Sequence, residues 1–344
     1  MSQCDITQYY GREIQRLPSY RKQKLLRSAA NYWRSQGFPY IKLSRAELEI
    51  EYRHFAKSLS NYTIAGNVAG LSTVGLKIAN SFHPQMWHIP SQGHSRTPID
   101  HFNDDGTLQK LLERAARFWP DRQCWSAYSV RNIFRVYAGG RVSNFRPTIA
   151  WSIMNDMAPD GGTVLDFCAG FGGRLLGTIP LDRHYIGIDP AKAQIRGLKK
   201  MVSSLKYWAK CTTELINGCA EEIMPLIPSS SVDLVFTSPP YFNLERYCSS
   251  SDQSYSRYQS YSLWKQEFLQ TVIEESHRIL KPKGKLVINI SNLKNFKIAD
   301  DLQFITKPLF RHTHQISMSM PCRPLQRVNG SAYRHEPIFV FNKK

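Results

Sequence analysis

The residues of this sequence best suited to chemistry form one short run, Thr237-Ser-Pro-Pro-Tyr-Phe242. The run ends an apolar segment, residues 232–237, whose composition predicts a buried strand. Two consecutive prolines remove two backbone donors and stiffen the turn, which leaves carbonyl groups as acceptors. A hydroxyl at Ser238 and the carbonyl of Pro239 could accept both hydrogens of an amino group, while Tyr241 offers a face for stacking a flat ring. The run predicts a site that aims an amine lone pair at an electrophile, without a covalent nucleophile of its own.

A glycine-rich loop, Asp166-Phe-Cys-Ala-Gly-Phe-Gly-Gly-Arg174, lies between a predicted strand over residues 163–167 and a predicted helix over 173–178. Glycine lets the backbone approach a ligand closely, and ligands of open α/β sheets bind at the carboxyl ends of the strands. A second predicted strand, 185–189, ends in an acid about twenty residues after the loop, where a carboxylate can hydrogen-bond a ribose diol. The loop matches neither the dinucleotide motif GxGxxG nor a phosphate-binding loop. We therefore expect Asp189 to bind the ribose of an adenosine in a cofactor of another kind.

Both motifs resemble those of known methyltransferases. The glycine loop and the segment Tyr185-Ile-Gly-Ile-Asp-Pro190 resemble the cofactor site of class I S-adenosylmethionine-dependent methyltransferases, and the run at 237–242 closely resembles the catalytic motif of DNA amino-methyltransferases. SPPY is typical of enzymes that methylate N4 of cytosine, and DPPY or NPPY of those that methylate N6 of adenine. The resemblance covers roughly residues 141–341. It implies S-adenosyl-L-methionine as cofactor and double-stranded DNA, with the target base flipped out, as substrate.

The order of the motifs adds detail to this resemblance. The cofactor motif precedes the catalytic motif by about 70 residues, as in the subset of these enzymes whose recognition region does not separate the two. Enzymes of that subset have a cofactor-contacting helix just before the loop. Pro147 suits the first turn of such a helix, and Phe145 would then lie near the methionine end of the cofactor. An ordinary core helix is the alternative.

The resemblance implies two sets of site residues. The cofactor contacts would be Phe145, Asp166, Ala169, Gly170, Phe171, Gly172, Asp189, Ala220, Glu221 and Thr237. Asp166 would hold the amino-acid end directly or through water, and Ala220 and Glu221 would lie beside the adenine. Helix capping is the alternative role for Asp166 and Asp189. The catalytic residues would be Ser238, Pro239, Pro240 and Tyr241. We expect no metal site, because none of the seven cysteines forms a CxxC pair.

Strands and helices alternate regularly after residue 120. Strands are predicted at 163–167, 185–189, 232–237 and 285–290, and helices at 173–178, 191–205 and 264–280. Residues 315–320 and 337–341 predict an antiparallel strand pair, with a basic loop between them that contains Arg323, Arg327, Arg334 and a turn at Asn329-Gly330. We expect residues 121–344 to form an α/β domain, a class I methyltransferase (Rossmann-like) fold with a mostly parallel sheet and an antiparallel C-terminal strand pair.

The first 120 residues have a different character. The formal net charge of the chain is +18, for which a polyanion such as nucleic acid is the simplest partner and a merely solubilising surface the alternative. Helices are predicted at 19–36, where Gly37 ends the helix, and at 105–118, while residues 61–104 could hold short strands and turns. Arg21, Lys22 and Lys24 would face DNA or solvent. We expect residues 1–120 to form a basic, partly helical region with a possible role in DNA recognition.

Other functions stay open at this point. The alternatives within the enzymes are an N6-adenine DNA methyltransferase and an RNA or protein amino-methyltransferase. A ring-carbon methyltransferase needs a cysteine nucleophile, and the only Pro-Cys pair, at Cys322, lies far beyond the catalytic strand. A non-catalytic DNA-binding protein with a degenerate methyltransferase fold is an alternative of a different class.

Two further expectations concern the surroundings of the enzyme. The Tyr- and Ser-rich stretch over residues 243–262 could close over a flipped base, contact the DNA strand backbone or form a disordered surface loop. The sequence contains no recognisable nuclease motif, so any cognate restriction or defence protein would be a separate chain. It also contains neither a signal peptide nor a stretch long enough to span a bilayer, so we expect a cytoplasmic protein.

Overall fold

The computed structural model describes residues 5–90, 95–138, 142–242, 252–321 and 333–344. Within these ranges the chain forms two compact units. The first takes in residues 5–42 and 84–143, and the second residues 43–83 and 144–344. This division does not follow a single boundary at residue 120, because residues 43–83 pack with the second unit and residues 121–143 with the first.

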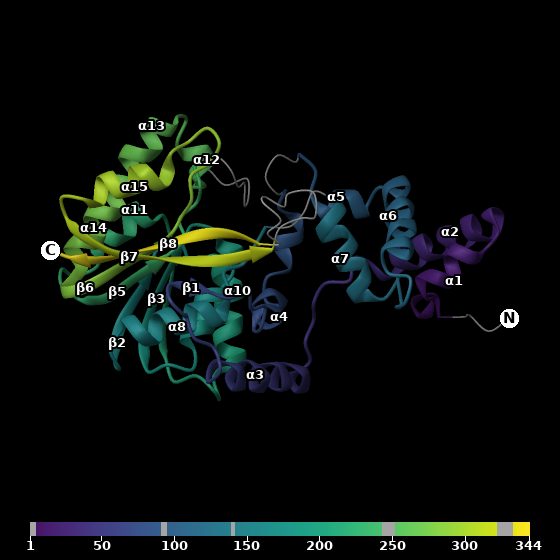
Figure 1. The fold of residues 1–344 in the computed structure, drawn as a ribbon, viewed down its shortest axis with the longest axis horizontal. Helices are drawn as coiled ribbons and strands as arrows, with labels where there is room; N and C mark the ends of the chain where they lie inside the picture. The colour runs from purple at the N-terminus through teal and green to yellow at the C-terminus, as the bar shows by residue number, and fades with distance from the viewer. Residues whose placement is uncertain (1–4, 91–94, 139–141, 243–251, 322–332) are drawn as a thin grey trace. The chain divides into compact units, whose positions relative to one another are not determined.

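The second unit is built on an eight-stranded sheet (Figure 1). The strand order is β1-β7-β8-β6-β5-β2-β3-β4. The strands are β1 (Val68–Ala69), β2 (Gly162–Asp166), β3 (Arg183–Asp189), β4 (Thr212–Asn217), β5 (Val232–Thr237), β6 (Leu280–Asn289), β7 (Phe310–Pro321) and β8 (Tyr333–Lys343). All neighbours pair in parallel except β8, which is antiparallel to both β6 and β7. This mixed sheet, with its antiparallel C-terminal strands, is the class I methyltransferase arrangement that the sequence predicts.

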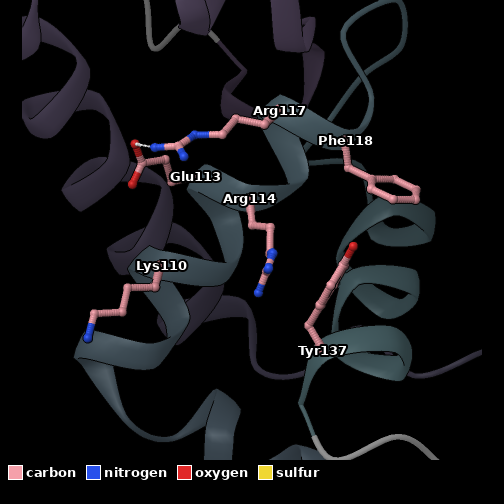
Figure 2. Close-up of a pocket in the computed structure, with 6 residues that line it drawn as sticks. All are labelled: Lys110, Glu113, Arg114, Arg117, Phe118 and Tyr137. Carbon is pink, nitrogen blue, oxygen red and sulfur yellow. Dashed lines mark hydrogen bonds and ion pairs between the residues drawn. The ribbon is translucent and has the colours of Figure 1, made fainter. Parts of the chain in front are cut away.

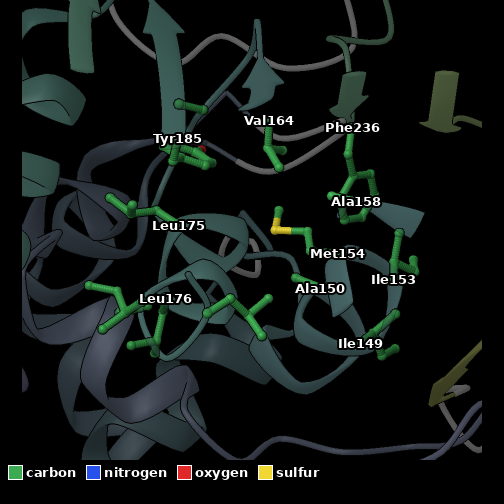
Figure 3. Packing of buried hydrophobic residues seen from close by; sticks show 14 of the residues in the cluster. Ile149, Ala150, Ile153, Met154, Ala158, Val164, Leu175, Leu176, Tyr185 and Phe236 are labelled. Atoms are coloured by element: carbon green, nitrogen blue, oxygen red, sulfur yellow. The ribbon is translucent and has the colours of Figure 1, made fainter. Parts of the chain in front are cut away.

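Helices cover both faces of this sheet, because successive strand residues point to opposite sides. Val164 of β2 belongs to one apolar core and Leu165 to the other. The first core is covered by α3 (Arg45–Leu59), α4 (Leu76–Ser81), α8 (Pro147–Met157), α9 (Gly173–Thr178) and α10 (Lys192–Leu205). The second is covered by α11 (Ala220–Ile223), η3 (Met224–Leu226), η4 (Trp264–Gln270), α14 (Thr271–Ile279) and α15 (Ile298–Thr306). Figure 3 shows Ile153 and Met154 of α8 facing Val164 and Phe236 across the first core.

The first unit is helical. Its elements are η1 (Ile6–Gln8), α1 (Gly11–Arg16), α2 (Ser19–Gln36), η2 (Pro84–His88), α5 (Pro98–Phe102), α6 (Asp105–Phe118) and α7 (Ala127–Tyr137). They share an apolar core of their own, which includes Trp33, Leu112 and Trp125. The predicted helices at 19–36 and 105–118 are confirmed residue for residue. Gly37 follows α2 with a φ of 75°, a conformation that favours glycine over other residues.

Three predictions need correction. Residues 264–280 do not form one α-helix, because they begin as a π-helix at Trp264, continue as α14 and enter β6 at Leu280. The described part of residues 61–104 contains three short helices, α4, η2 and α5, besides turns, and its strand content is the two-residue β1. Residues 212–217 form strand β4, which the sequence pattern does not predict. The expected basic loop with Arg323, Arg327 and Asn329-Gly330 lies outside the described residues.

Candidate active site

The glycine loop connects β2 to α9 through two residues in the left-handed region, Gly170 with φ 56° and Gly172 with φ 76°. The space around the loop also excludes larger side chains at two of its glycines. A Cβ on Gly173 would lie 1.9 Å from the carbonyl oxygen of Phe145, and one on Gly172 would lie 2.7 Å from Met201. Gly173 therefore allows the loop to pack against the segment that precedes α8, and Gly172 allows it to approach α10.

Asp189 lies at the end of β3 and is 8% exposed. Its Oδ2 accepts a hydrogen bond of 2.9 Å from the amide of Gly170, and its Oδ1 accepts one of 2.9 Å from the amide of Ala191. Burial raises the pKa of this carboxyl to about 6, although the two amide donors oppose the shift. A carboxylate oxygen can accept more than one hydrogen bond, so each oxygen keeps capacity for a ribose hydroxyl. The side chain fits the expected ribose role and also holds the glycine loop.

Asp166 at the end of β2 is fully buried and densely bonded. Its carboxylate accepts hydrogen bonds from Arg174 Nε at 2.7 Å and Nη2 at 3.2 Å. It also accepts them from the hydroxyls of Tyr185 at 2.7 Å and Thr237 at 2.8 Å, and from the amide of Cys168 at 3.3 Å. Five donors occupy its two oxygens, so a direct bond from a cofactor ammonium would have to displace one of them.

The buried ion pair of Arg174 and Asp166 affects the pKa values of Arg174 itself and of the neighbouring Tyr185. Burial is opposed by the adjacent carboxylate, and the net effect raises the pKa of Arg174, so the guanidinium stays charged. Burial together with the Asp166 carboxylate raises the pKa of Tyr185 well above its ordinary value, so this phenol stays a donor. The guanidinium of Arg174 also lies over the ring of Phe145, with its central carbon 5.5 Å from the ring centroid. Phe145 is thereby held beside the glycine loop.

The other expected cofactor residues lie around the same strand ends. Ala169, Phe171 and Ala220 are buried, and Thr237 is fully buried with its hydroxyl donated to Asp166. Glu221 at the start of α11 accepts a 2.5 Å hydrogen bond from the hydroxyl of Tyr258 and pairs with Arg257 at 3.0 Å. Residues 243–251 lie outside the described part, so the possible loop over a base is described only from residue 252 onward.

The expected catalytic turn, residues 238–242, follows β5 and is supported by β6. The hydroxyl of Ser238 donates toward the main-chain oxygen of Asn289 at 3.2 Å and toward its Oδ1 at 3.3 Å. Asn289 is 4% exposed, and its Nδ2 donates to the carbonyl of Pro337 at 3.0 Å. Because a hydroxyl has a single hydrogen, this arrangement turns the lone pairs of Ser238 away from Asn289. Ser238 is thus available as an acceptor for an amine hydrogen.

Tyr241 is positioned from the antiparallel strand β8. Its hydroxyl donates to Oε1 of Glu336 at 2.7 Å. Pro239 is buried and Pro240 half-buried, and Phe242 follows with a φ of 53°. Phe242 is buried and packs edge-on against Tyr261 and Phe296, with ring centroids 5.8 Å and 5.3 Å away. The turn is therefore fixed at both ends, by Thr237 before it and Phe242 after it.

The structure joins the two motifs directly. Thr237, the residue before Ser238, donates its hydroxyl to Asp166, the residue that opens the glycine loop. Sequence reasoning missed Arg174, Tyr185, Asn289 and Glu336, which hold these motifs in place. It also missed Asn144, whose Oδ1 accepts from the amide of Gly173 at 3.1 Å and whose Nδ2 donates to the carbonyl of Phe171 at 2.9 Å. Asn144 caps α9 where Gly172 offers no side chain.

The described residues contain neither a metal-binding cluster nor a membrane-spanning helix. No group of three or more His, Cys, Asp and Glu side chains there is arranged to hold a metal ion. No helix in the described part of the chain has the length and apolar character needed to cross a membrane.

The strand order and the glycine loop together define a class I methyltransferase fold, for which S-adenosyl-L-methionine is the cofactor. Residues 232–344 match the N6/N4 family model described as DNA methylase. Over 137 residues the chain is 31% identical to the type II methyltransferase M.BglII from Bacillus subtilis. That alignment covers 38% of this chain and 35% of the relative, so the chain spans about a third of the curated relative's length. The C-terminal third of the chain is thus similar to the N6/N4 DNA methylase family, and M.BglII is a distant homologue.

Solved structures show more remote similarity. A tRNA (m1A58) methyltransferase from Aquifex aeolicus is 10% identical, with a TM-score of 0.41 over 59% of this chain and 71% of that one. An S-adenosylmethionine-dependent methyltransferase from Methanosarcina mazei is 14% identical, with a TM-score of 0.39 over 56% of this chain and 96% of that one.

Proposed function

We propose that this protein transfers a methyl group from S-adenosyl-L-methionine to the exocyclic amino group of a DNA base, and that the favoured target is N4 of cytosine in double-stranded DNA. The observation that carries the proposal is the orientation of Ser238. Its hydroxyl hydrogen is directed to Asn289, so its oxygen is left to accept a hydrogen from the target amine. A site that accepts hydrogen bonds suits an amino group, which has two N–H donors, better than a ring carbon, which has none.

In this proposal, Asp189 binds the ribose of the cofactor and the glycine loop lies against its amino-acid end. Asp166 acts by holding the loop and the catalytic turn together, because its oxygens are already occupied. Ala169, Gly170, Phe171 and Gly172 shape the cavity wall, and Ala220 and Glu221 lie on the adenine side. The cofactor, when bound, supplies an electrophilic methyl group.

The chain's own groups then prepare the amine. Ser238 Oγ and the carbonyl of Pro239 each accept one amine hydrogen, which favours a more tetrahedral nitrogen and aims its lone pair away from the ring. Tyr241 stacks on the flipped base, an interaction of about 1–3 kcal/mol, and Glu336 fixes the hydroxyl of that tyrosine. Pro240 keeps the turn rigid, so orientation and electrostatics supply the catalysis.

The type of residue before the two prolines favours cytosine over adenine. Serine at this position is typical of N4-cytosine enzymes, while N6-adenine enzymes typically carry aspartate or asparagine there. We further propose that the enzyme works in the cytoplasm beside a restriction or defence protein on another chain, because the homologous M.BglII is described as a type II methyltransferase.

The product of the reaction tests the proposal. Duplex DNA is incubated with the protein and labelled cofactor, digested to nucleosides and analysed by mass spectrometry. N4-methylcytosine is expected, and it should be lost in Ser238→Ala while cofactor affinity, measured by calorimetry, stays near the wild-type value. N6-methyladenine would keep the reaction class and change the base. Finding 5-methylcytosine alone, or methyl groups only in RNA or protein, would refute the assignment of the catalytic turn.

A further inference from the structure

The outer face of α6 in the first unit carries a row of cations. Lys110, Arg114 and Arg117 follow one another at spacings of four and three residues, so they lie on the same side of the helix. All three are exposed, whereas Leu108, Leu111, Leu112, Ala115 and Ala116 on the opposite side are buried in the unit's core. The charged face is therefore not needed for packing, and it is available for a partner.

This face is hollowed into a pocket of about 440 Å³ (Figure 2). The lining residues are Lys110, Glu113, Arg114, Arg117, Phe118 and Tyr137. The guanidinium of Arg114 lies over the ring of Tyr137 from α7, with its central carbon 4.0 Å from the centroid. Phe118 packs edge-on against the same ring, with centroids 6.1 Å apart. The aromatic rings thus hold one cation in a defined orientation.

The charges of the pocket are not balanced. Its one carboxylate, Glu113, pairs with Arg117 at 2.7 Å and with Lys22 of α2 at 2.8 Å. Among the residues that the structure describes, Lys110 and Arg114 have neither a carboxylate partner nor a hydrogen-bond partner. The ring of Tyr137 covers one face of the Arg114 guanidinium and leaves its N–H edge for an acceptor. A planar guanidinium recognises a phosphate through two parallel hydrogen bonds.

The whole first unit is charged in the same sense. Residues 1–42 and 84–143 contain sixteen Lys and Arg against seven Asp and Glu. The net charge of these 102 residues is therefore +9, half of the chain's +18, although they make up less than a third of its 344 residues. This excess of positive charge attracts a polyanion to the whole surface of the first unit. The α6 pocket is the part of that surface whose shape suits binding of a polyanion.

We propose that the pocket formed by Lys110, Arg114 and Tyr137 binds the backbone phosphates of duplex DNA and is the main DNA anchor of the first unit. This inference rests on the proposed function, because it takes DNA as the substrate. It replaces the α2 residues as the expected contact, since Lys22 is engaged by Glu113 and Arg21 donates to the hydroxyl of Tyr20. Phosphate contacts position a protein on DNA without reading its sequence.

Two charge-reversed pairs within the same unit test the proposal. Lys110→Glu with Arg114→Glu is compared with Lys24→Glu with Arg27→Glu on the exposed side of α2, so that both variants change the charge equally. Binding of a fluorescent duplex is followed by anisotropy from 50 to 300 mM salt. We expect the α6 pair to weaken binding at least tenfold and to lower the slope of log K against log salt by about 2. The α2 pair should weaken it less and leave the slope nearly unchanged.

A charge-conserving variant separates shape from bulk electrostatics. Arg114→Lys keeps the net charge and loses the planar fork, so we expect a severalfold weaker affinity, and Tyr137→Leu should act in the same direction. Circular dichroism and cofactor calorimetry verify that the variants stay folded. Equal losses for both reversed pairs, together with an unchanged Arg114→Lys, would overturn the α6 anchor and leave the proposed function standing. Polyglutamate that competes as well as unlabelled duplex would indicate an acidic protein partner instead. A wild-type protein with no affinity for duplex DNA would overturn both proposals.

Discussion

The orientation of Ser238 by Asn289 can be tested through two substitutions at position 289. Asn289→Ala removes the Oδ1 acceptor at 3.3 Å from Ser238 Oγ but leaves the main-chain oxygen at 3.2 Å. Both distances are long for hydroxyl hydrogen bonds, so the lost acceptor contributes no more than the usual net value of about 0.5–1.5 kcal/mol. If that energy orients Ser238 in the transition state, turnover should fall about twofold to tenfold.

The same substitution has a separate cost in stability. Asn289 Nδ2 donates to the carbonyl of Pro337 at 3.0 Å, and this bond is lost in both Asn289→Ala and Asn289→Asp. The free energy of unfolding, measured in urea, should fall by about 1–3 kcal/mol in each because the carbonyl is left unpaired. Asn289→Asp keeps an acceptor for Ser238, so its turnover should stay closer to wild type even though its stability falls at least as far.

Single-turnover methylation of duplex DNA with saturating cofactor measures the effect. In a Ser238→Ala background there is no hydroxyl to orient, so Asn289→Ala should cause little further loss of turnover. Turnover that follows stability in both position-289 variants, or full additivity of the two alanine substitutions, would show that Asn289 only supports the fold.

Four other outcomes follow from the site. Asp189→Ala should weaken cofactor binding by about 1–3 kcal/mol in calorimetry, because charge-assisted hydrogen bonds are lost; unchanged affinity would contradict the ribose role. Burial raises the pKa of Asp189 from 3.8 to about 6, so the folded protein binds a proton at this carboxyl more tightly than the unfolded chain does. The contribution of this proton to the free energy of unfolding is therefore lost as pH rises through about 6. Urea unfolding of Asp189→Asn should lack that decline, and a decline equal to wild type would exclude Asp189 as its source. Arg174→Met should lower the free energy of unfolding by about 3–5 kcal/mol, because the buried charge of Asp166 loses its partner; a loss under 1 kcal/mol would mean that Asp166 takes up a proton instead. Tyr241→Phe should retain far more turnover than Tyr241→Ala, because stacking survives without the bond to Glu336, and equal losses would assign the function to the hydroxyl.

Local sequence pattern was sufficient for the elements that it determines. Helix α6 has five buried apolar residues on one face and an Asp104 side chain that accepts from the amide of Thr107, so both its period and its start are written in the sequence. Strand β5 is predicted residue for residue because it is a short apolar run buried on both faces of a parallel sheet. The secondary structure of such segments is determined by their own sequence and does not depend on the elements that pack against them.

Other elements depend on neighbours that a local pattern does not reveal. Strand β4, TTELIN, contains only exposed and half-buried residues, as expected of a strand that pairs only with β3 at the edge of the sheet. Its composition resembles a loop as much as a strand. Residues 264–280 carry a helical apolar pattern throughout, yet pairing with β5 draws Leu280 into β6 opposite Val232. Tertiary pairing therefore overrides the helical signal at its end.

The residues of the candidate site also fall into those that local sequence pattern predicts and those that depend on tertiary pairing. The positions of Asp189, Ser238 and Tyr241 were predictable because each stands at or just after the carboxyl end of a strand, and parallel neighbours bring those ends together. Asn289 ends a strand in the same way, and the signal that could have found it was present in the sequence. Glu336 gave no comparable signal, since it contacts Tyr241 only because β8 returns antiparallel beside β6, 95 residues away in the chain.

The carboxylate of Asp166 links the glycine loop to the turn at Ser238, which explains why these two motifs occur on neighbouring strands. One carboxylate receives Arg174 from the helix after the glycine loop, Tyr185 from β3 and Thr237 from the residue before Ser238. A neutral residue could not satisfy the buried guanidinium, and a longer acid would not reach the same donors without shifting β2. The position of the glycine loop and the position of the turn at Ser238 are therefore set by the same two oxygen atoms. In the proposed reaction the methyl donor and the amine must meet within an ångström-scale tolerance, and a shared rigid anchor fixes that distance more firmly than two independent supports would.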